Sequence, residues 1–236
     1  MVQIRQVPEK TGPLVALARQ IAALCITSPD LFLGLADAVE ACKYQYTYRK
    51  LQASLSAVTA AKRDDVEQLK QLLRTYFESQ DPSWDLGYRR GFLVEEIIAA
   101  LGPAPLRLKT PAGSQVFRAA QLLDHKRRLV CGKKNLDVAF VAPNGRIADG
   151  LECKASLGKW LSVRQQRICP EAADKLAYMR CLARTLPALG CAFEASLAGL
   201  EFSLSQQDSA ALAGAGYAFR IITRRIIRDA IRAVAS

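Results

Sequence analysis

Asp137, Glu152 and Lys154 are the residues of this sequence whose types and spacing best suit chemistry. They flank Pro143–Arg146, a Pro-Asn-Gly-Arg sequence that is a strong signal for a hairpin turn. A loop centred on this turn predicts that Asp137 faces Glu152 across two paired strands, with Cβ atoms ~4.5–5.5 Å apart. Lys154 shares their face because side chains alternate along a strand.

Two opposed carboxylates in apolar strands repel each other and lower stability unless a positive charge lies between them. Lys154 supplies such a charge as a salt bridge on an exposed sheet face, which is the structural interpretation. The functional interpretation is a divalent cation between Asp137 and Glu152. Mg²⁺ prefers carboxylate, carbonyl and water oxygens, polarises a phosphate and lowers the pKa of a bound water. A bulge at Gly150 would shift the register by one residue and separate this set.

Histidine and cysteine usage excludes several other chemistries. The chain has one histidine, His125, which excludes most zinc hydrolases and His-dependent cysteine catalysis. The seven cysteines are odd in number and contain no Cys-x-x-Cys pair, which argues against a disulfide framework and a zinc knuckle. Cys153 points away from the face of Glu152 and Lys154 and is expected to be a buried apolar residue. No phosphate-binding P-loop sequence is present.

The charge of the chain predicts a polyanionic partner. The 236 residues carry a formal charge of +11, and half of them are apolar. The length fits one large domain, or a core domain with a smaller second domain. No apolar run reaches membrane-spanning length and the N-terminus resembles no signal peptide, so we expect a cytoplasmic protein with no membrane contact. Two basic clusters, at Arg107–Lys134 and Arg220–Arg232, predict nucleic-acid binding. The candidate nucleic-acid contacts are Arg127, Arg128, Lys133, Lys134, Arg224, Arg225 and Arg228.

The pattern of elements predicts an α/β fold with a helical N-terminal region. We place a helical region at residues 1–82, for dimerisation or DNA contact, and a second domain at 83–236. The expected helices are one from Thr11 to about Leu24, a long one from Ser28 into the fifties, one from Asp64 to about Phe77, and then 92–101, 170–186 and 221–234. The expected strands are 136–141, 147–155 and 191–200.

Two further segments have a structural and a functional interpretation. Tyr44, Tyr46 and Tyr48 alternate in a Lys-flanked cluster, which can stack on bases, although core and surface tyrosines are commoner. The segment after Lys154 contains polar residues that either contact a phosphate or form a surface loop: Ser156, Lys159, Arg164, Gln165 and Gln166. For each residue taken singly, we favour the surface loop.

Asp137, the hairpin and Glu152-Cys153-Lys154 together resemble the PD-(D/E)xK motif of the restriction-endonuclease-like nuclease superfamily, with Leu136 in place of the proline. The segment Gly91–Glu96 is similar to the first core helix of that superfamily, and the match makes Glu95 its acidic residue, with Glu96 as the alternative. The resemblance covers about residues 87–200. It implies a mixed central sheet flanked by helices.

The resemblance also implies an activity. Asp137 and Glu152 would ligate Mg²⁺, or Mn²⁺ as a substitute, with the backbone carbonyl of Cys153 as a third ligand. Lys154 would position the attacking water, and Glu95 would support the metal. The sequence therefore predicts a Mg²⁺-dependent DNA endonuclease of a restriction, defence or repair type, acting as a homodimer in many such families, with RNA left open as a substrate. The alternatives are an inactive nucleic-acid-binding subunit with this fold, and a purely helical interaction protein.

Overall fold

A computed structural model describes residues 3–8, 11–164 and 167–235 of the chain. Its centre is one sheet whose strands lie side by side in sequence order, from β1 to β6. The elements of the described residues are β1 Gln3–Gln6, α1 Pro13–Cys25, α2 Pro29–Ala41, α3 Tyr48–Ser56, α4 Arg63–Glu78, α5 Leu86–Leu101, β2 Gln115–Leu123, β3 Leu136–Val141, β4 Ile147–Lys154, α6 Leu157–Leu161, α7 Pro170–Ala188, β5 Ala192–Gly199, α8 Gln206–Gly214, β6 Arg220–Ile222 and α9 Arg224–Ala235.

The sheet is mixed. Strands β1 to β4 pair antiparallel, whereas β4, β5 and β6 pair in parallel. A parallel pair needs a long crossover, and α6 with α7 supplies it between β4 and β5, as α8 does between β5 and β6. The α/β class predicted from the sequence is therefore confirmed, and the hypothesis of a purely helical interaction protein is wrong.

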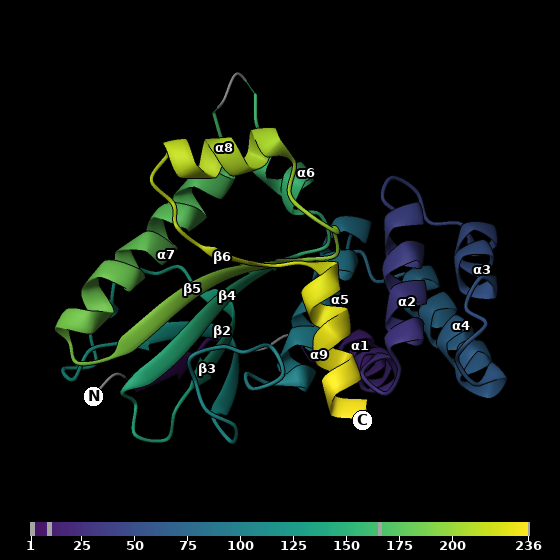
Figure 1. Ribbon diagram of the computed structural model, residues 1–236, viewed down its shortest axis with the longest axis horizontal. Helices are drawn as coiled ribbons and strands as arrows, with labels where there is room; N and C mark the ends of the chain where they lie inside the picture. Colours follow the sequence, from purple (N-terminus) through teal and green to yellow (C-terminus); the bar gives the residue numbers. More distant parts are fainter. Residues whose placement is uncertain (1–2, 9–10, 165–166, 236) are drawn as a thin grey trace.

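Helices cover both faces of the sheet (Figure 1). On one face, α7 packs with α6 and α8 over a core that contains Leu176, Met179 and Leu197. On the other face, α5 and α9 pack on a second core that contains Leu151 and Ile227, and this core continues among α1 to α4. The strands between these two layers are apolar on both sides, as buried strands must be.

The N-terminal region is helical as predicted, with two differences. The expected long helix ends at Ala41 and a new helix begins at Tyr48, because Thr47 is extended and its side chain accepts a hydrogen bond from the Lys50 N–H, which starts a separate helix. The short strand β1 precedes the helices and pairs with β2. Within the described residues, we find no helix whose length and apolarity would let it cross a bilayer.

Two adjacent arginines in α5 attach the N-terminal helices to the sheet domain. The buried Arg89 guanidinium donates to backbone carbonyls at and beyond the end of α4, at 2.8 Å to that of Tyr76 and 2.8 Å to that of Ser79. The buried Arg90 donates to the Val39 carbonyl of α2 at 2.9 Å and to the Lys43 carbonyl at 3.4 Å. Both side chains therefore position α5 against the ends of other helices.

The C-terminal part differs from the sequence prediction in two respects. Residues 220–222 form strand β6 and only the following residues form a helix, because Ile221 and Ile222 pair with β5. Cys131, before β3, is joined to Cys181 of α7 by a disulfide. An odd cysteine count without a Cys-x-x-Cys pair speaks against a framework of several disulfides, but it does not exclude a single bond between residues that folding brings together.

Candidate active site

The β3–β4 hairpin has the register that its turn predicts. Val138 pairs with Leu151, so the next position along the two strands sets Asp137 against Glu152. Gly145 in the turn has a φ of 62°, a left-handed conformation that costs glycine little. The hairpin therefore brings the two carboxylates together, as the sequence suggested.

Gly150 does not shift this register. It pairs with Ala139 in the regular ladder. A Cβ added at Gly150 would lie 2.6 Å from the Leu136 side chain and 2.7 Å from that of Phe193. The glycine is needed because these two side chains fill the space above it, so the predicted risk of a bulge at this position is not realised.

The strands separate where the site begins. The Cys153 N–H donates to Oδ2 of Asp137 at 2.9 Å, so a side chain, not a backbone carbonyl, accepts this hydrogen bond. On the other side of β3, Ala119 has a φ of 49°, a strained value for a residue with a Cβ. Ala119 and Asp137 line the same cavity. Ala119 and Asp137 therefore meet at the cavity, while β2 and β3 keep their register on both sides of them.

Lys154 lies between the two carboxylates. Its Nζ is 3.1 Å from Oδ2 of Asp137 and 2.6 Å from Oε1 of Glu152. Both the structural and the functional interpretation of the sequence place Lys154 on this face. The structural interpretation is an ion pair of Lys154 with the carboxylates, and the structure contains this ion pair. The site is much less exposed than that interpretation supposed, since Glu152 is 3% exposed.

A second lysine, which the sequence analysis missed, completes the group. Lys175 of α7 places its Nζ 2.5 Å from Oε2 of Glu152 and 3.5 Å from Oδ1 of Asp137. A signal was present in the sequence: Lys175 precedes Met179 and Leu182 by four and seven residues, the spacing of one helix face. Because both of those residues are buried, Lys175 is a charged residue on a core-facing stripe.

The two adjacent glutamates of α5 have different surroundings. Glu96 is 1% exposed and forms a two-pronged ion pair with Arg118 of β2, at 2.8 and 2.7 Å, with Arg19 at 3.5 Å. Glu95 instead lines the cavity that contains Asp137. The structure therefore brings Glu95, the first choice of the sequence analysis, to the site and gives Glu96 a role in holding α5 on the sheet.

Burial and mutual charge set the protonation of the group. Burial, and then the charge of Asp137, raise the pKa values of Glu95 and Glu152. Burial would also raise the pKa of Asp137, but Lys154 and Lys175 outweigh it and lower that pKa. Burial lowers the pKa of both lysines, whereas Asp137 and Glu152 outweigh it and raise the pKa values above normal. Both lysines are therefore cations at neutral pH.

A cavity of about 460 Å³ opens onto this group. Tyr88 and Asn135 form part of its wall, and burial, with help from Glu95 and Asp137, raises the pKa of Tyr88 to about 12. The cavity gives a ligand direct access to Glu95, Asp137 and Lys154, whereas Glu152 is buried and is not part of the lining. Its lining residues are Asp85, Gly87, Tyr88, Gly91, Glu95, Ala119, Asn135, Asp137, Cys153 and Lys154.

The donor set suits a hard cation. Asp137 and Glu152 supply carboxylate oxygens, and Gly91 faces the Cys153 carbonyl, which an added Cβ would approach to 3.9 Å. Mg²⁺ often takes only one or two protein carboxylates and completes its shell with water. In the described ranges, no cluster of three or more His, Cys, Asp or Glu side chains has the arrangement of a metal site. Two carboxylates and a carbonyl are donors of the kind that Mg²⁺ takes, and in this structure Lys154 and Lys175 hold the two oxygens of Glu152.

Cys153 and His125 lie as the sequence predicted. The Cys153 side chain is fully buried in the core beneath α5, and burial raises the pKa of its thiol well above normal. His125 is exposed in the loop between β2 and β3.

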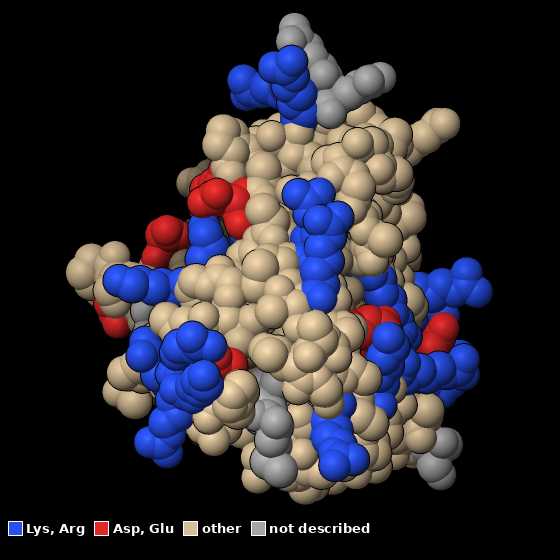
Figure 2. Space-filling model, turned by 90° about the vertical axis from the view of Figure 1, so that its left-hand side faces the viewer, with Lys and Arg blue, Asp and Glu red and all other residues tan. Residues whose placement is uncertain are grey.

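A larger hollow of about 660 Å³ lies elsewhere on the molecule, and its charged residues are Lys109, Arg180, Arg184, Arg220 and Glu194. It has no pair of carboxylates, so we place the candidate site in the smaller cavity. Figure 2 shows that basic side chains on the face to the left of Figure 1 stand in separate groups, with fewer acidic side chains among them. Positive charge on this face is therefore spread over several groups and is not gathered in one patch.

The predicted nucleic-acid contacts of the β2–β3 connection are exposed. Arg127 and Arg128 belong to a tight loop, in which Arg128 pairs with Asp124 at 2.8 Å. Lys133 and Lys134 lie just before β3, and Lys134 pairs with Asp174 of α7 at 2.8 Å.

The predicted contacts on α9 differ from one another. Arg225 is exposed and Arg228 is half-buried beside Asp229. Arg224 is 5% exposed and binds Asp37 of α2 at 2.8 Å, so it packs α9 on α2, and its role as a phosphate contact stays a prediction. A tertiary contact of this kind leaves no trace in the local charge pattern.

Of the residues after the motif, Ser156 caps α6 and both Lys159 and Arg164 are exposed, whereas Gln165 and Gln166 lie outside the described residues. Comparison of the chain with protein-family models and with curated proteins gives no match.

Proposed function

We propose that this protein is a Mg²⁺-dependent nuclease with a restriction-endonuclease-like fold, acting as a DNA endonuclease. The observation that carries the proposal is the meeting of Asp137, Glu152 and Lys154 on one face of a hairpin, beside a cavity that Asp137, Lys154 and Glu95 line. The order of elements supports the fold assignment, since α5, the β3–β4 hairpin, α7 and the parallel strand β5 follow one another as in that superfamily.

In this proposal, Asp137, Glu152 and the Cys153 carbonyl would hold the magnesium ion. The ion, or Mn²⁺ in its place, would polarise the scissile phosphate and lower the pKa of a bound water. Burial raises the pKa of Glu95, and a cation beside it would favour the ionised form of its carboxyl.

The lysines act as cations in this mechanism. Lys154 keeps its proton, since its pKa is raised, so it donates hydrogen bonds to the attacking water and to the phosphate oxygen on which charge develops. Lys175 bonds both carboxylates from the opposite element and holds them in place while substrate enters.

The basic side chains near the site supply affinity for the polyanion. Lys133 is exposed, and it lies four residues before Asp137. RNA as a substrate is a variant of the proposal that the assay below tests, and a homodimer is a second variant.

The test is incubation of the purified protein with supercoiled plasmid, linear duplex and single strands of DNA and RNA, with Mg²⁺, with Mn²⁺ and with EDTA. We expect metal-dependent conversion of supercoiled plasmid to open and linear forms. Glu152→Gln and Lys154→Ala should each remove it. Glu194→Gln is the matched control, because Glu194 is also on the sheet and paired with a lysine, Lys109 at 3.5 Å, but lies outside the cavity.

Wild-type rates in the Lys154→Ala protein would overturn the assigned mechanism. Binding of DNA without cleavage under any metal would overturn the nuclease proposal and favour an inactive nucleic-acid-binding subunit.

A further inference from the structure

We propose that the protein binds unpaired nucleotides on a track beside the candidate site, with Tyr44 and Trp160 as stacking surfaces and Lys159 between them. The proposal deepens the proposed function, on which it rests, by naming the substrate class: nucleic acid that has a single-stranded portion next to the cleaved bond. The shared chemistry is an exposed base and a phosphate, so both DNA and RNA strands qualify.

Tyr44 differs from its two neighbours in the tyrosine cluster. Tyr46 stacks on Phe77 with ring centroids 5.4 Å apart, and Tyr48 lies beneath Arg74 at 4.8 Å, so both belong to the fold. Tyr44 is 82% exposed, more than the other large apolar or aromatic side chains exposed among the described residues. Its ring is therefore available to a ligand.

Two lysines approach the Tyr44 ring from different elements. Lys43 Nζ lies 5.9 Å from the ring centroid, and Lys159 Nζ, from α6, lies 5.1 Å from it. An aromatic face flanked by cations suits a base with its phosphates, because the ring stacks on the base and the cations attract the backbone. It suits an apolar protein partner poorly, since that partner would bury the charges.

A cavity of about 370 Å³ joins this surface to the candidate site. Lys154 lines both this cavity and the one that contains Asp137. Lys159 and Trp160 also line it, and Lys154 Nζ is 5.5 Å from the Trp160 ring centroid. A strand can therefore run from the carboxylates past Trp160 and Lys159 to Tyr44.

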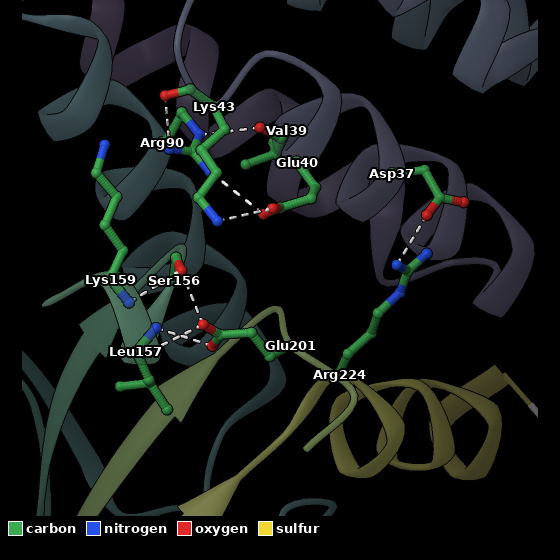
Figure 3. A network of polar contacts seen from close by, with 11 residues as sticks. Asp37, Val39, Glu40, Lys43, Arg90, Ser156, Leu157, Lys159, Glu201 and Arg224 are labelled. Carbon is green, nitrogen blue, oxygen red and sulfur yellow. Dashed lines mark hydrogen bonds and ion pairs between the residues drawn. The ribbon is translucent and has the colours of Figure 1, made fainter. Parts of the chain in front are cut away.

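The track is held by buried polar contacts on both sides (Figure 3). On one side, Arg90 binds the Lys43 carbonyl, so the residue directly before Tyr44 is tied to α5. On the other side, Glu201 accepts from the Ser156 hydroxyl at 2.8 Å and the Leu157 N–H at 2.8 Å, at the start of α6.

The start of α6 in turn directs Lys159. Ser156 accepts a hydrogen bond from the Lys159 N–H, and in Figure 3 the Lys159 side chain points away from Glu201. The stacking surface is thus built on anchored elements although Tyr44 itself lies between two helices.

Unpaired nucleotides fit this surface better than duplex. In a duplex, each base face is already covered by its neighbours, whereas a single strand can turn its bases onto protein rings. The rings and cations lie beyond Lys154, on the side of the cavity toward α6. A duplex end or a junction would therefore place its unpaired strand here while its bond to be cleaved lies at the carboxylates.

The test is fluorescence anisotropy with labelled oligo(dT), oligo(rU) and a duplex of equal length, in EDTA so that no strand is cut. We expect Tyr44→Ala to weaken binding of a single strand by about tenfold, as for loss of one stacked base, and to leave duplex binding within about twofold. Tyr44→Phe should bind as the wild type does, because it keeps the ring. Phe202→Ala is the control: Phe202 is 66% exposed and lies 4.6 Å from the Arg224 guanidinium, but lines neither cavity.

A second measurement locates the strand. The chain has two tryptophans, and Trp84 is 4% exposed, so oligo(dT) should quench mainly Trp160, and Trp160→Phe should remove the quenching.

Equal single-strand binding by wild type and Tyr44→Ala, or equal loss for single strand and duplex, would overturn this inference. Loss in Tyr44→Phe would also overturn it, since the ring remains. These outcomes are independent of the cleavage assay. If the wild type cuts plasmid but Tyr44→Ala binds single strands as the wild type does, only the track is refuted. If Tyr44→Ala loses single-strand binding but the wild type never cuts, only the nuclease proposal is refuted.

Discussion

Lys175 Nζ lies 2.5 Å from Oε2 of Glu152, which ties the crossover helix α7 to the strand that carries the candidate motif. With Lys154 it places two ammonium groups against the carboxylates of Asp137 and Glu152. The two carboxylates therefore do not face each other as bare charges, and the helix that covers the sheet becomes part of the site.

Substitution of Lys175 should affect cleavage without unfolding the protein. Lys175→Met keeps the apolar stem but removes the charge that holds Glu152 and Asp137, so we expect cleavage to fall by about a hundredfold, the size typical for loss of one preorganised charge. Lys70→Met is the control, because Lys70 also pairs with a carboxylate, Glu67 at 2.7 Å, but lies outside the cavity. Unchanged cleavage rates in Lys175→Met, with circular dichroism like that of the wild type, would contradict this role.

Asp137→Asn should lower stability in metal-free buffer. From the sequence alone, relief of repulsion between opposed carboxylates would raise it. The structure reverses the sign, because Lys154, Lys175 and the Cys153 N–H favour the ionised form and hold the pKa of Asp137 below normal. Removal of one partner from a buried charged group costs about 3–5 kcal/mol. Urea unfolding of both proteins in EDTA measures the difference, and a more stable Asp137→Asn protein would refute the ion-pair geometry.

The raised pKa of Tyr88 predicts that the protein loses stability at alkaline pH. Burial, Glu95 and Asp137 raise its pKa to about 12, above the value near 10 of an unfolded chain. The contribution of Tyr88 to the free energy of unfolding is therefore complete below about pH 10, and it disappears as the pH rises toward 12. Urea unfolding at pH 9 and at pH 11.5 should show a smaller loss for Tyr88→Phe than for the wild type. In Glu95→Gln, the absorbance of the Tyr88 phenolate should appear at lower pH.

The Cys131–Cys181 disulfide should contribute to stability. It closes a loop with a sequence separation of 50, for which loop entropy gives about 2–4 kcal/mol. Since it joins the segment before β3 to α7, reduction should also slow cleavage by loosening Lys175 from Asp137. Thermal unfolding with and without dithiothreitol tests the first effect, with Cys181→Ser as the genetic equivalent. Cys169→Ser is the control, because Cys169 is a half-buried free thiol.

The salt dependence of DNA binding should separate the basic residues. Each phosphate contact contributes a slope of ~−0.9 in a plot of log affinity against log salt. Arg225→Ala should flatten the slope by about one contact, because this side chain is exposed on α9. Arg224→Ala should leave the slope unchanged and lower stability instead, since Arg224 binds Asp37. A titration in Ca²⁺ measures both, and a flatter slope for Arg224→Ala would show that its ion pair opens on binding.

The hairpin was predictable because its information is local. The turn sequence and the alternation of apolar residues determine the register, and with it the meeting of Asp137, Glu152 and Lys154. The resemblance of Gly91–Glu96 to the first core helix of the nuclease superfamily predicts Glu95 as the site residue. It separates Glu95 from Glu96 only by the position of each in that segment. The structure adds the reason for the difference, which is the ion pair of Glu96 with Arg118.

Contacts between distant segments could not be predicted. Lys175 and the Cys131–Cys181 bond depend on how α7 crosses the sheet, and Arg224 depends on how α9 meets α2. Strand β6 was assigned to a helix because Ile221 and Ile222 continue the apolar pattern of α9, and only pairing with β5 makes them extended. In each case tertiary packing decided between local patterns that were equally acceptable.

Strand β1 has a consequence for the order in which the chain folds. Arg5 of β1 donates to Gln121 of β2 at 3.0 Å across a sequence separation of 116, with four helices and α5 in between. The β3–β4 hairpin closes over a few residues, so loop closure costs it far less entropy. We expect the carboxylate pair to form early and the β1 edge to be added last, so backbone amides of β1 should exchange with deuterium sooner than those of β3. A nascent chain would then possess its acidic pair before the whole sheet is complete.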